Sequence, residues 1–251
     1  MPTVCVRSLF LAFALFCAQL FQPLNVSSQT TEVWTPGAIP MGSQIGPGAA
    51  FPVIRGQPYT AEVLQQQTTV LTDGTKRVAE ARNVHRRDSR GRLLDEKLPS
   101  PHVKIGEGEV FTQHGFVLVD PVGLSSSQWD DDTRTVVVSS IRAQQAQVDN
   151  FDRPCPASSG YATVEQQELG ERIIHGAVAV GCRTTATTAG EHRIAVLIET
   201  WRSKALHIPL LTIEHQSNGA ESRTEVIGLD LGEPDETKFE PPQQYKHMVG
   251  R

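Results

Sequence analysis

Short hydrophobic runs alternate with turn-forming residues along most of the chain, and this pattern predicts strands rather than helices. In the C-terminal part, segments rich in Val, Ile and Thr cover Arg172–Thr188, Arg193–Arg202, Leu206–His215 and Ser222–Leu231. Gly, Pro, Asn or charged residues bound each segment, as is typical of antiparallel strands.

The N-terminal part of the pattern predicts two hairpins. Tyr59–Thr72 and Thr75–Arg87 flank Asp73-Gly74, a pair that readily takes the positive φ angles of a tight turn. Ser126–Trp129 and Arg134–Ile141 flank a run of three aspartates. This run lacks the glycine and distant glutamate of a calcium loop, so we interpret it as a polar turn.

Shorter segments complete the expected β structure. A turn at Asp88–Gly91 leads into a strand at Leu93–Leu98, and Asp120-Pro121 ends a strand at Phe116–Val119. Arg142–Val148 is rich in Gln and Ala and predicts one or two helical turns. The predicted fold is mainly β: a curved antiparallel sheet or open half-barrel with few short helices, whose strand order stays open.

The first 28 residues have the features of a signal peptide. Arg7 precedes an apolar run, Leu9–Ala18, which is too short to span a bilayer, and Val26 and Ser28 favour cleavage before Gln29. An uncleaved anchor helix is the alternative. No later segment is apolar and long enough to cross a membrane, so we expect no transmembrane span in the mature chain, and a periplasmic or secreted location.

The rest of the chain divides by composition. Residues 29–58 are dense in Pro and Gly and predict a disordered leader. Residues 59–245 form a single predicted β-rich domain, which the Asn150–Gly160 loop divides into halves, 59–149 and 161–245.

Export also bears on the cysteines. Cys5 and Cys17 leave with the signal peptide, so Cys155 and Cys182 remain as a pair in an oxidising compartment. A disulfide between them is the preferred interpretation, with two buried free thiols as the alternative.

Charge and motifs exclude several classes of function. A net charge of −5 and 6% aromatic residues argue against a nucleic-acid partner. Basic residues crowd the Thr75–Leu98 region, and we interpret them as a solvated sheet face rather than a patch for anionic lipid or polysaccharide; they are Lys76, Arg77, Arg82, Arg86, Arg87, Arg90, Arg92 and Lys97. The sequence has no metal motif, nucleophile elbow, P-loop or dinucleotide fingerprint. We therefore predict no enzyme, catalytic residue, metal or cofactor.

One predicted hairpin supplies the candidate ligand residues. If Arg193–Arg202 and Leu206–His215 turn at Ser203-Lys204-Ala205, Trp201 faces His207 and Glu199 faces Pro209. That arrangement is an aromatic wall beside an ionisable pair, although cross-strand packing with a satisfied histidine gives the same pattern. The candidate residues are Leu197, Glu199, Trp201, His207 and Ile213.

Apolar residues occupy both the odd and the even positions of these strands, and therefore both faces, which predicts an apolar concave face in the C-terminal sheet. One set comprises Val178, Val180, Ile194, Val196, Ile198, Ile208 and Leu210, and the other comprises Ala195, Leu197, Leu211 and Ile213. Phe239 is expected to fold back over one of these faces.

Five stretches in order resemble a group of secreted bacterial proteins: Arg87–Arg92, Val119–Pro121, Glu168–Gly176, Glu199–Trp201 and Pro234–Phe239. That group is similar to the lipoprotein-carrier superfamily of periplasmic carriers and receptors. The resemblance implies an open half-barrel whose concave side accepts acyl chains or a protein segment. Carriers plug this barrel with helices, for which the chain shows no clear pattern, and no binding residue carries over.

The resulting expectation is a non-enzymatic envelope protein that binds a lipid-like ligand or another envelope protein in its curved sheet. The alternative is a structural or interaction module without a small-molecule site, and a hydrolase comes third.

Overall fold

A computed structural model describes residues 50–99, 103–105, 108–110, 114–144, 155, 161–188 and 195–250. The chain divides into two units, 1–31 and 32–251, and every described residue belongs to the second. The predicted signal peptide, and the predicted leader up to residue 49, lie outside the described residues.

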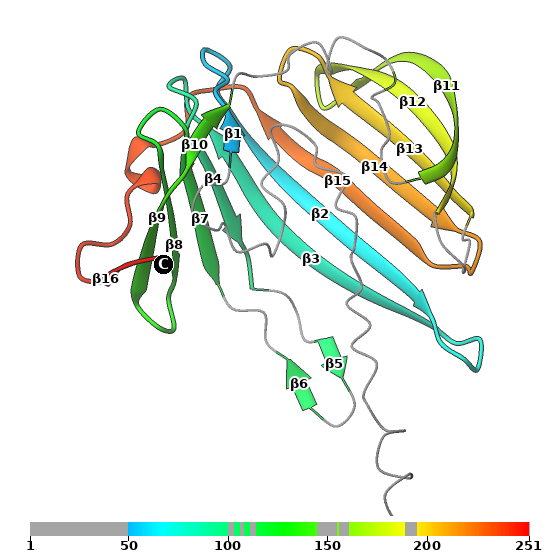
Figure 1. Cartoon of the computed structure of the whole chain (residues 1–251), viewed down its shortest axis with the longest axis horizontal. Coiled ribbons are helices and arrows are strands. Elements are labelled where there is room, and N and C mark those ends of the chain that lie inside the picture. Colours follow the sequence, from blue (N-terminus) through cyan, green and yellow to red (C-terminus); the bar gives the residue numbers. More distant parts are fainter. Residues whose placement is uncertain are drawn as a thin grey trace, which may run out of the picture. The chain divides into compact units, whose positions relative to one another are not determined.

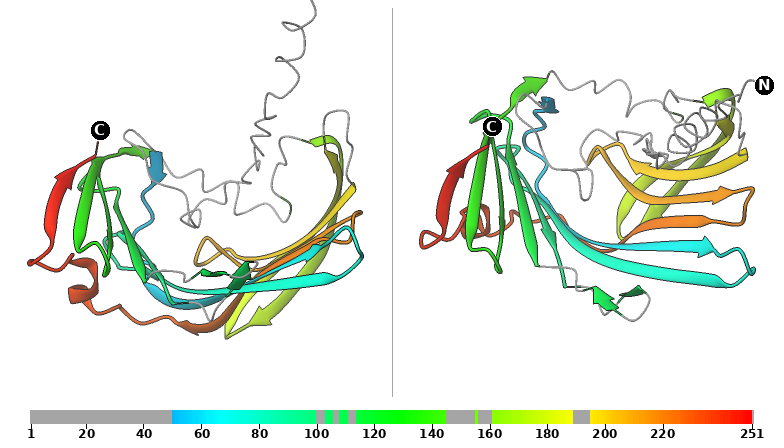
Figure 2. Two further views of the ribbon diagram at one scale, coloured as in Figure 1. Left: turned by 90° about the horizontal axis from the view of Figure 1, so that it is seen from below. Right: turned by 60° about the horizontal axis from the view of Figure 1, so that its bottom comes forward.

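One large sheet of twelve strands dominates the described residues (Figure 1). Its strands, in spatial order, are β11 (Tyr161–Ile174), β12 (Ala177–Thr188), β13 (Ala195–Ser203), β14 (Ile208–Gln216), β15 (Glu221–Asp230), β2 (Tyr59–Val70), β3 (Lys76–Arg87), β4 (Leu93–Lys97), β7 (Gly115–Asp120), β8 (Ser125–Asp130), β9 (Thr135–Ser140) and β16 (Lys246–Val249). Neighbours are antiparallel except β9 and β16, which are parallel. The sheet is curved and open (Figure 2), so the predicted mainly β, curved antiparallel sheet is confirmed.

Local hairpins follow the sequence pattern closely. β2 and β3 meet at the predicted Asp73-Gly74 turn, where Gly74 has a φ of 82° and the Asp73 carboxylate accepts the Thr75 N–H at 2.9 Å. β8 and β9 meet at the aspartate run. In the second turn, the Asp130 carboxylate accepts the Thr133 N–H at 2.6 Å, and Arg134 takes the positive φ of 49°.

Three elements differ from the sequence prediction. Arg142–Gln144 is strand β10 rather than a helical turn, and it pairs in parallel with β1 (Ala50–Pro52). β1 also shows that ordered pairing begins before Tyr59. A parallel partner comes from a distant segment, which local periodicity cannot reveal.

The third difference concerns Arg172–Thr188, which the pattern presents as one segment. It contains a turn at His175-Gly176, where both residues have positive φ, and this turn joins β11 to β12. Most of β11 is polar and exposed because it is the edge of the sheet, so its hydrophobic signal is weak. A second small sheet pairs β5 (Val103–Ile105) with β6 (Gly108–Val110).

The two faces of the sheet can be told apart by two phenylalanines. Phe51 of β1 packs on Leu93 and Val119, and in the left view of Figure 2 β1 (blue) lies inside the curve. Phe239 of the short helix η1 (Glu236–Phe239, orange-red) lies outside the curve and packs on the opposite side of the same strands, against Leu94 and Leu118. Leu93 therefore marks the concave face and Leu94 the convex face.

Candidate functional site

A neutral row of side chains crosses the concave face. Directly paired residues of antiparallel strands share a face, so the pairings from Leu93 through Arg87 and Tyr59 define the concave positions. One row across six adjacent strands, here called the polar row, comprises Cys182, Thr200, Thr212, Thr224, Gln65 and Ala81. Hydroxyl and amide groups therefore dominate the centre of this face.

The adjacent row on the convex face is charged. It comprises Arg183, Glu199, Ile213, Arg223, Gln66 and Glu80, one residue along each strand from the polar row. Its members are joined to partners on the same face: Arg183 to Glu199 at 3.2 Å, Gln66 to Glu80 at 2.6 Å and Arg223 to Glu225 at 2.8 Å. Such a lattice of polar pairs is typical of a solvated sheet face.

Four of the five predicted ligand residues lie on this convex face rather than the concave one. Glu199 pairs with Ile213, Trp201 with Leu211 and Leu197 with His215. The predicted facing of Trp201 with His207 and of Glu199 with Pro209 is wrong. The turn extends to His207, which has a φ of 54°, and a bulge follows Trp201, so the register moves away from the one that a tight turn gives.

Trp201 is packed by its own neighbours. Only 7% of it is exposed; the Arg172 guanidinium lies 3.9 Å from its ring centroid, and a Cβ on Gly181 would lie 2.7 Å from the ring. Its indole N–H donates to Glu199 Oε1 at 2.8 Å. This bond, together with Arg183, holds the pKa of Glu199 below its usual value despite partial burial. These contacts fit cross-strand packing rather than an open ligand wall.

The turn between β13 and β14 is tied to the concave face by a buried arginine. Arg87 is 1% exposed, and its Nη2 donates to the Leu206 carbonyl at 2.7 Å while its Nε donates to the Gln57 carbonyl at 2.9 Å. Its guanidinium also lies over the Tyr59 ring. Burial lowers the pKa of Arg87, but arginine stays charged because its ordinary value is very high.

The apolar positions of the concave face are largely buried already. Tyr59, Ala61, Val63 and Val226 are at most 6% exposed. Among the described residues of β13–β15, β2 and β3, no large exposed hydrophobic side chain points to the concave side; Leu197 and Val78 point to the other. The expected open apolar face is therefore not present on these strands. On neighbouring β12, Val178 shares the side of Cys182 and is 55% exposed. Ile194 lies outside the described residues.

Cys155 and Cys182 form the disulfide that the sequence predicts, with their Cα atoms 5.2 Å apart. Cys182 begins the polar row, so the bridge fastens Cys155 to the concave face at its β12 end. Beyond Cys182, the row continues on β11 with the exposed carboxylate of Glu168, which pairs with Cys182 in the register.

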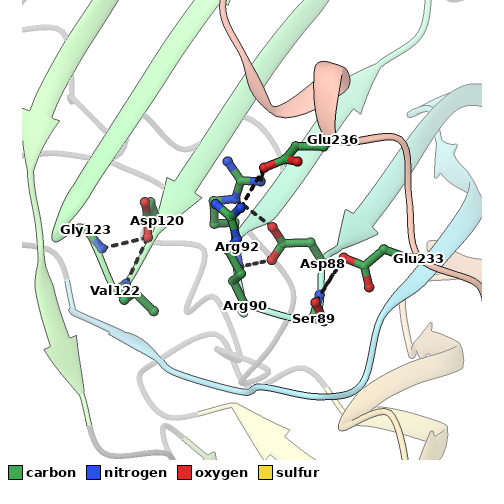
Figure 3. A network of polar contacts seen from close by, with 9 residues as sticks. All are labelled: Asp88, Ser89, Arg90, Arg92, Asp120, Val122, Gly123, Glu233 and Glu236. Carbon is green, nitrogen blue, oxygen red and sulfur yellow. Dashed lines mark hydrogen bonds and ion pairs between the residues drawn. The ribbon is translucent and has the colours of Figure 1, made fainter.

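A polar cavity of about 360 Å³ lies where the β3–β4 turn meets the C-terminal segment. Figure 3 shows its network: Glu233 accepts the Ser89 N–H at 3.0 Å, Glu236 pairs with Arg90 at 2.8 Å, and Arg92 pairs with Asp88 at 2.6 Å. These groups satisfy one another, so we interpret the cavity as a tie between the turn and the C-terminal segment.

The basic residues of Thr75–Leu98 do not form one patch. Arg77 and Arg87 point to the concave side, whereas Arg82 and Arg86 point to the convex side, where Arg86 pairs with Glu96 at 2.7 Å. The part of the chain that the structure describes also holds no group of three or more His, Cys, Asp or Glu side chains suited to a metal ion.

The polar row was not predicted from the sequence. Thr200, Thr212 and Thr224 recur at a constant spacing, one in each of three consecutive strands. That spacing is the signal that a search for aligned hydroxyls could have used, once each strand was assigned.

No family model matches the sequence, and no curated protein matches it. Among solved structures, the chain is similar to a chain of the Pseudomonas aeruginosa MucA/MucB complex, with 15% identity, a TM-score of 0.39, and coverage of 76% of this chain and 58% of that chain. It is also similar to a LolA-superfamily protein from Nitrosomonas europaea, with 9% identity, a TM-score of 0.30, and coverage of 74% and 92%. A third similar structure is a putative outer membrane lipoprotein-sorting protein domain from Vibrio parahaemolyticus, with 10% identity, a TM-score of 0.26, and coverage of 73% of this chain and 89% of that chain.

The superfamily that the sequence resembles is thus represented among these structures. The chain spans less than two thirds of the length of the MucB-complex chain. Identities and TM-scores of this size carry no argument about function.

Proposed function

We propose that the protein is a non-enzymatic protein of the bacterial cell envelope that binds a partner on the concave face of its sheet. The contrast between the two faces supports this most strongly. The charged side chains of the convex row pair with neighbours on their own face, whereas the polar row carries hydroxyl and amide groups suited to pairing with a partner.

Of the two partner classes, another envelope protein fits the polar row better than a lipid-like ligand. The Thr and Gln side chains both donate and accept hydrogen bonds, as peptide groups do. An acyl chain over this row would bury the same groups without partners, which is unfavourable. A structural or interaction module without a small-molecule site is the alternative.

A periplasmic or secreted location belongs to the same proposal. The disulfide suits an oxidising compartment, and we propose that residues 1–28 are a cleaved signal peptide, followed by a leader and a single β-rich domain. None of the described residues forms a helix long and apolar enough to span a bilayer. N-terminal sequencing of the exported protein should find Gln29 first; a chain that starts at Met1 would contradict cleavage.

A pair of matched substitutions tests the binding face. Thr224→Arg places a cation on the polar row, and Thr68→Arg places the same group on the convex face of neighbouring β2. Native mass spectrometry of protein purified from its own periplasm should show a co-purifying polypeptide that Thr224→Arg removes and Thr68→Arg retains. Equal loss with both variants, or no bound species with the unmodified chain, would contradict the proposal. Bound lipid instead would favour the other partner class.

A further inference from the structure

β16 is attached to the sheet almost entirely through its main chain. The Lys246 N–H donates to the Arg134 carbonyl at 2.9 Å, and the Gly250 N–H donates to the Val138 carbonyl at 2.8 Å. All four of its side chains are exposed, Val249 by 86% and Met248 by 44%. Side-chain burial therefore adds little to the attachment, and parallel pairing is slightly weaker than antiparallel pairing.

β9, the strand that pairs with β16, would be an edge strand of the sheet without it. Its sequence, Thr135–Ser140, is uncharged and rich in valine. Without β16 it would present a row of unpaired donors and acceptors, and such edges readily accept another strand. The edge of β9 is thus an acceptor site that the chain fills with its own C-terminal strand.

The site selects its occupant at one position. A Cβ on Gly250 would collide with the Ser139 side chain and lie 3.5 Å from a Val137 methyl group. A strand with a larger residue immediately after its fourth residue therefore fits only if the Ser139 hydroxyl rotates away, so glycine is favoured there. The C-terminal strand of this chain has this glycine.

A firm anchor lies only a short distance before β16. Phe239 is 2% exposed in the cluster with Leu94, Leu118, Trp129 and Val136. Tyr245 packs on the same cluster and its hydroxyl donates to Asp131 Oδ1 at 2.8 Å, so Tyr245 must leave together with β16. The tether between anchor and exchanged segment is then Glu240–Gln244, which spans at most about 17 Å when extended. β16 can therefore leave β9 while Phe239 stays in place.

We propose that two copies of this chain exchange their C-terminal strands, so that β16 of one copy pairs with β9 of the other in the register seen within one chain. Exchange of an identical element is a low-cost route to a dimer. This inference does not involve the concave face, so it stands or falls independently of the proposed function.

Cross-linking by paired cysteines tests the exchange in full-length chains. Met248 lies directly opposite Val137 in the register. One copy carries Val137→Cys and a second, mass-tagged copy carries Met248→Cys, while Cys155 and Cys182 remain bonded to each other. Mild oxidation of the mixture should yield a covalent heterodimer, since neighbouring strand positions satisfy disulfide geometry. A single chain that carries both substitutions shows whether a disulfide can form between positions 137 and 248.

Two controls make the result decisive. Gly250→Val in the copy that carries Met248→Cys should lower the heterodimer yield about tenfold, because its side chain collides with Ser139. Leu197→Cys replaces Val137→Cys as an exposed acceptor far along the sheet, and it should give background yield. A yield at this background, or insensitivity to Gly250→Val, overturns the exchange. Cross-linking of Val137→Cys to a synthetic peptide of residues 244–251 with cysteine at 248, but not to a second chain, also overturns it.

Discussion

Trp201 shows how a single side chain depends on neighbours from three strands. Arg172 and Gly181 enclose its ring, and Glu199 accepts its N–H. We expect Trp201→Ala to lower the free energy of unfolding by about 3–5 kcal/mol, because it empties a packed volume. Urea denaturation measures this. Leu197→Ala, at a position 37% exposed, is the matched control and should cost less than about 1 kcal/mol. Equal costs would mean that Trp201 is not packed.

Arg87 is a buried cation whose donors serve backbone carbonyls. Arg87→Met keeps the length of the side chain but leaves the carbonyls of Gln57 and Leu206 without these donors. Each unsatisfied group costs about 1–3 kcal/mol, so chemical denaturation should show a large loss of stability. Arg82→Met, where the arginine side chain is 55% exposed beside Glu62, should cost less than about 1 kcal/mol.

The residue positions also show where sequence reasoning stopped. It placed Glu199 and Trp201 on one face, which the alternation of a strand guarantees, and it placed His207 opposite Trp201, which the register contradicts. It could not say which face, because that depends on where the sheet curves. It also missed the bulge after Trp201, because a bulge leaves no mark in the hydrophobic pattern.

At the scale of elements, the disulfide fastens a long connection to β12. Cys155 and Cys182 are 27 positions apart, and closing a loop of this length restricts the unfolded chain by about 3.5 kcal/mol on the entropic model. We expect reduction, or the Cys155→Ser/Cys182→Ser pair of substitutions, to lower the free energy of unfolding by a similar amount. Thermal unfolding with and without reductant measures it. An unchanged midpoint would contradict a stabilising bridge.

A second element-scale contact is sensitive to pH. His114 bonds to Glu96 at 3.0 Å and to Asp131 at 2.7 Å. Burial alone would lower the pKa of His114, but these bonds outweigh burial and raise it above 6.5. Burial would raise the pKa of Glu96, yet its bonds to His114 and Arg86 lower it below 4.5.

The stabilisation from His114 is therefore fully present below about pH 6.5 and is lost as pH rises through the folded-state pKa. That from Glu96 is lost as pH falls through its own lowered pKa. His114→Gln should accordingly cost more stability at pH 5.5 than at pH 8, as measured by urea unfolding at both values. A cost that is the same at the two pH values would rule out the charged pairing.

At the scale of the whole sheet, the C-terminal segment covers the convex side of the β4–β9 strands. Phe239 is the one fully buried side chain among the described residues of Glu233–Gly250 that joins the cluster of Leu94 and Val136. We expect Phe239→Ala to lower the free energy of unfolding by about 3–5 kcal/mol. Met248→Ala, in β16, should change it by less than about 0.5 kcal/mol, since that side chain is exposed. Calorimetry of both variants measures these changes in the free energy of unfolding; equal changes would contradict the role of Phe239 as the anchor of the segment.

Only some strand pairings of the sheet could be predicted from the sequence, for a physical reason. Hairpins such as β2–β3 and β8–β9 were predictable because strand pattern and turn chemistry lie in one short window. β1, β10 and β16 were not, because each is three or four residues long and pairs in parallel with a distant segment. The polar row required the register of six strands at once, which no local pattern contains.

The pairing of β15 with β2 has a consequence for how the protein is made. β2 to β9 and β11 to β15 are each built from pairs of strands that lie near one another in the chain, but β15 joins β2 across a loop of about 160 residues. Since the chain emerges from its amino end, the N-terminal strands can assemble while the other edge of β2 still waits for β15. That edge is twelve residues long. We therefore expect a slow final folding step, during which newly made chains are prone to aggregate.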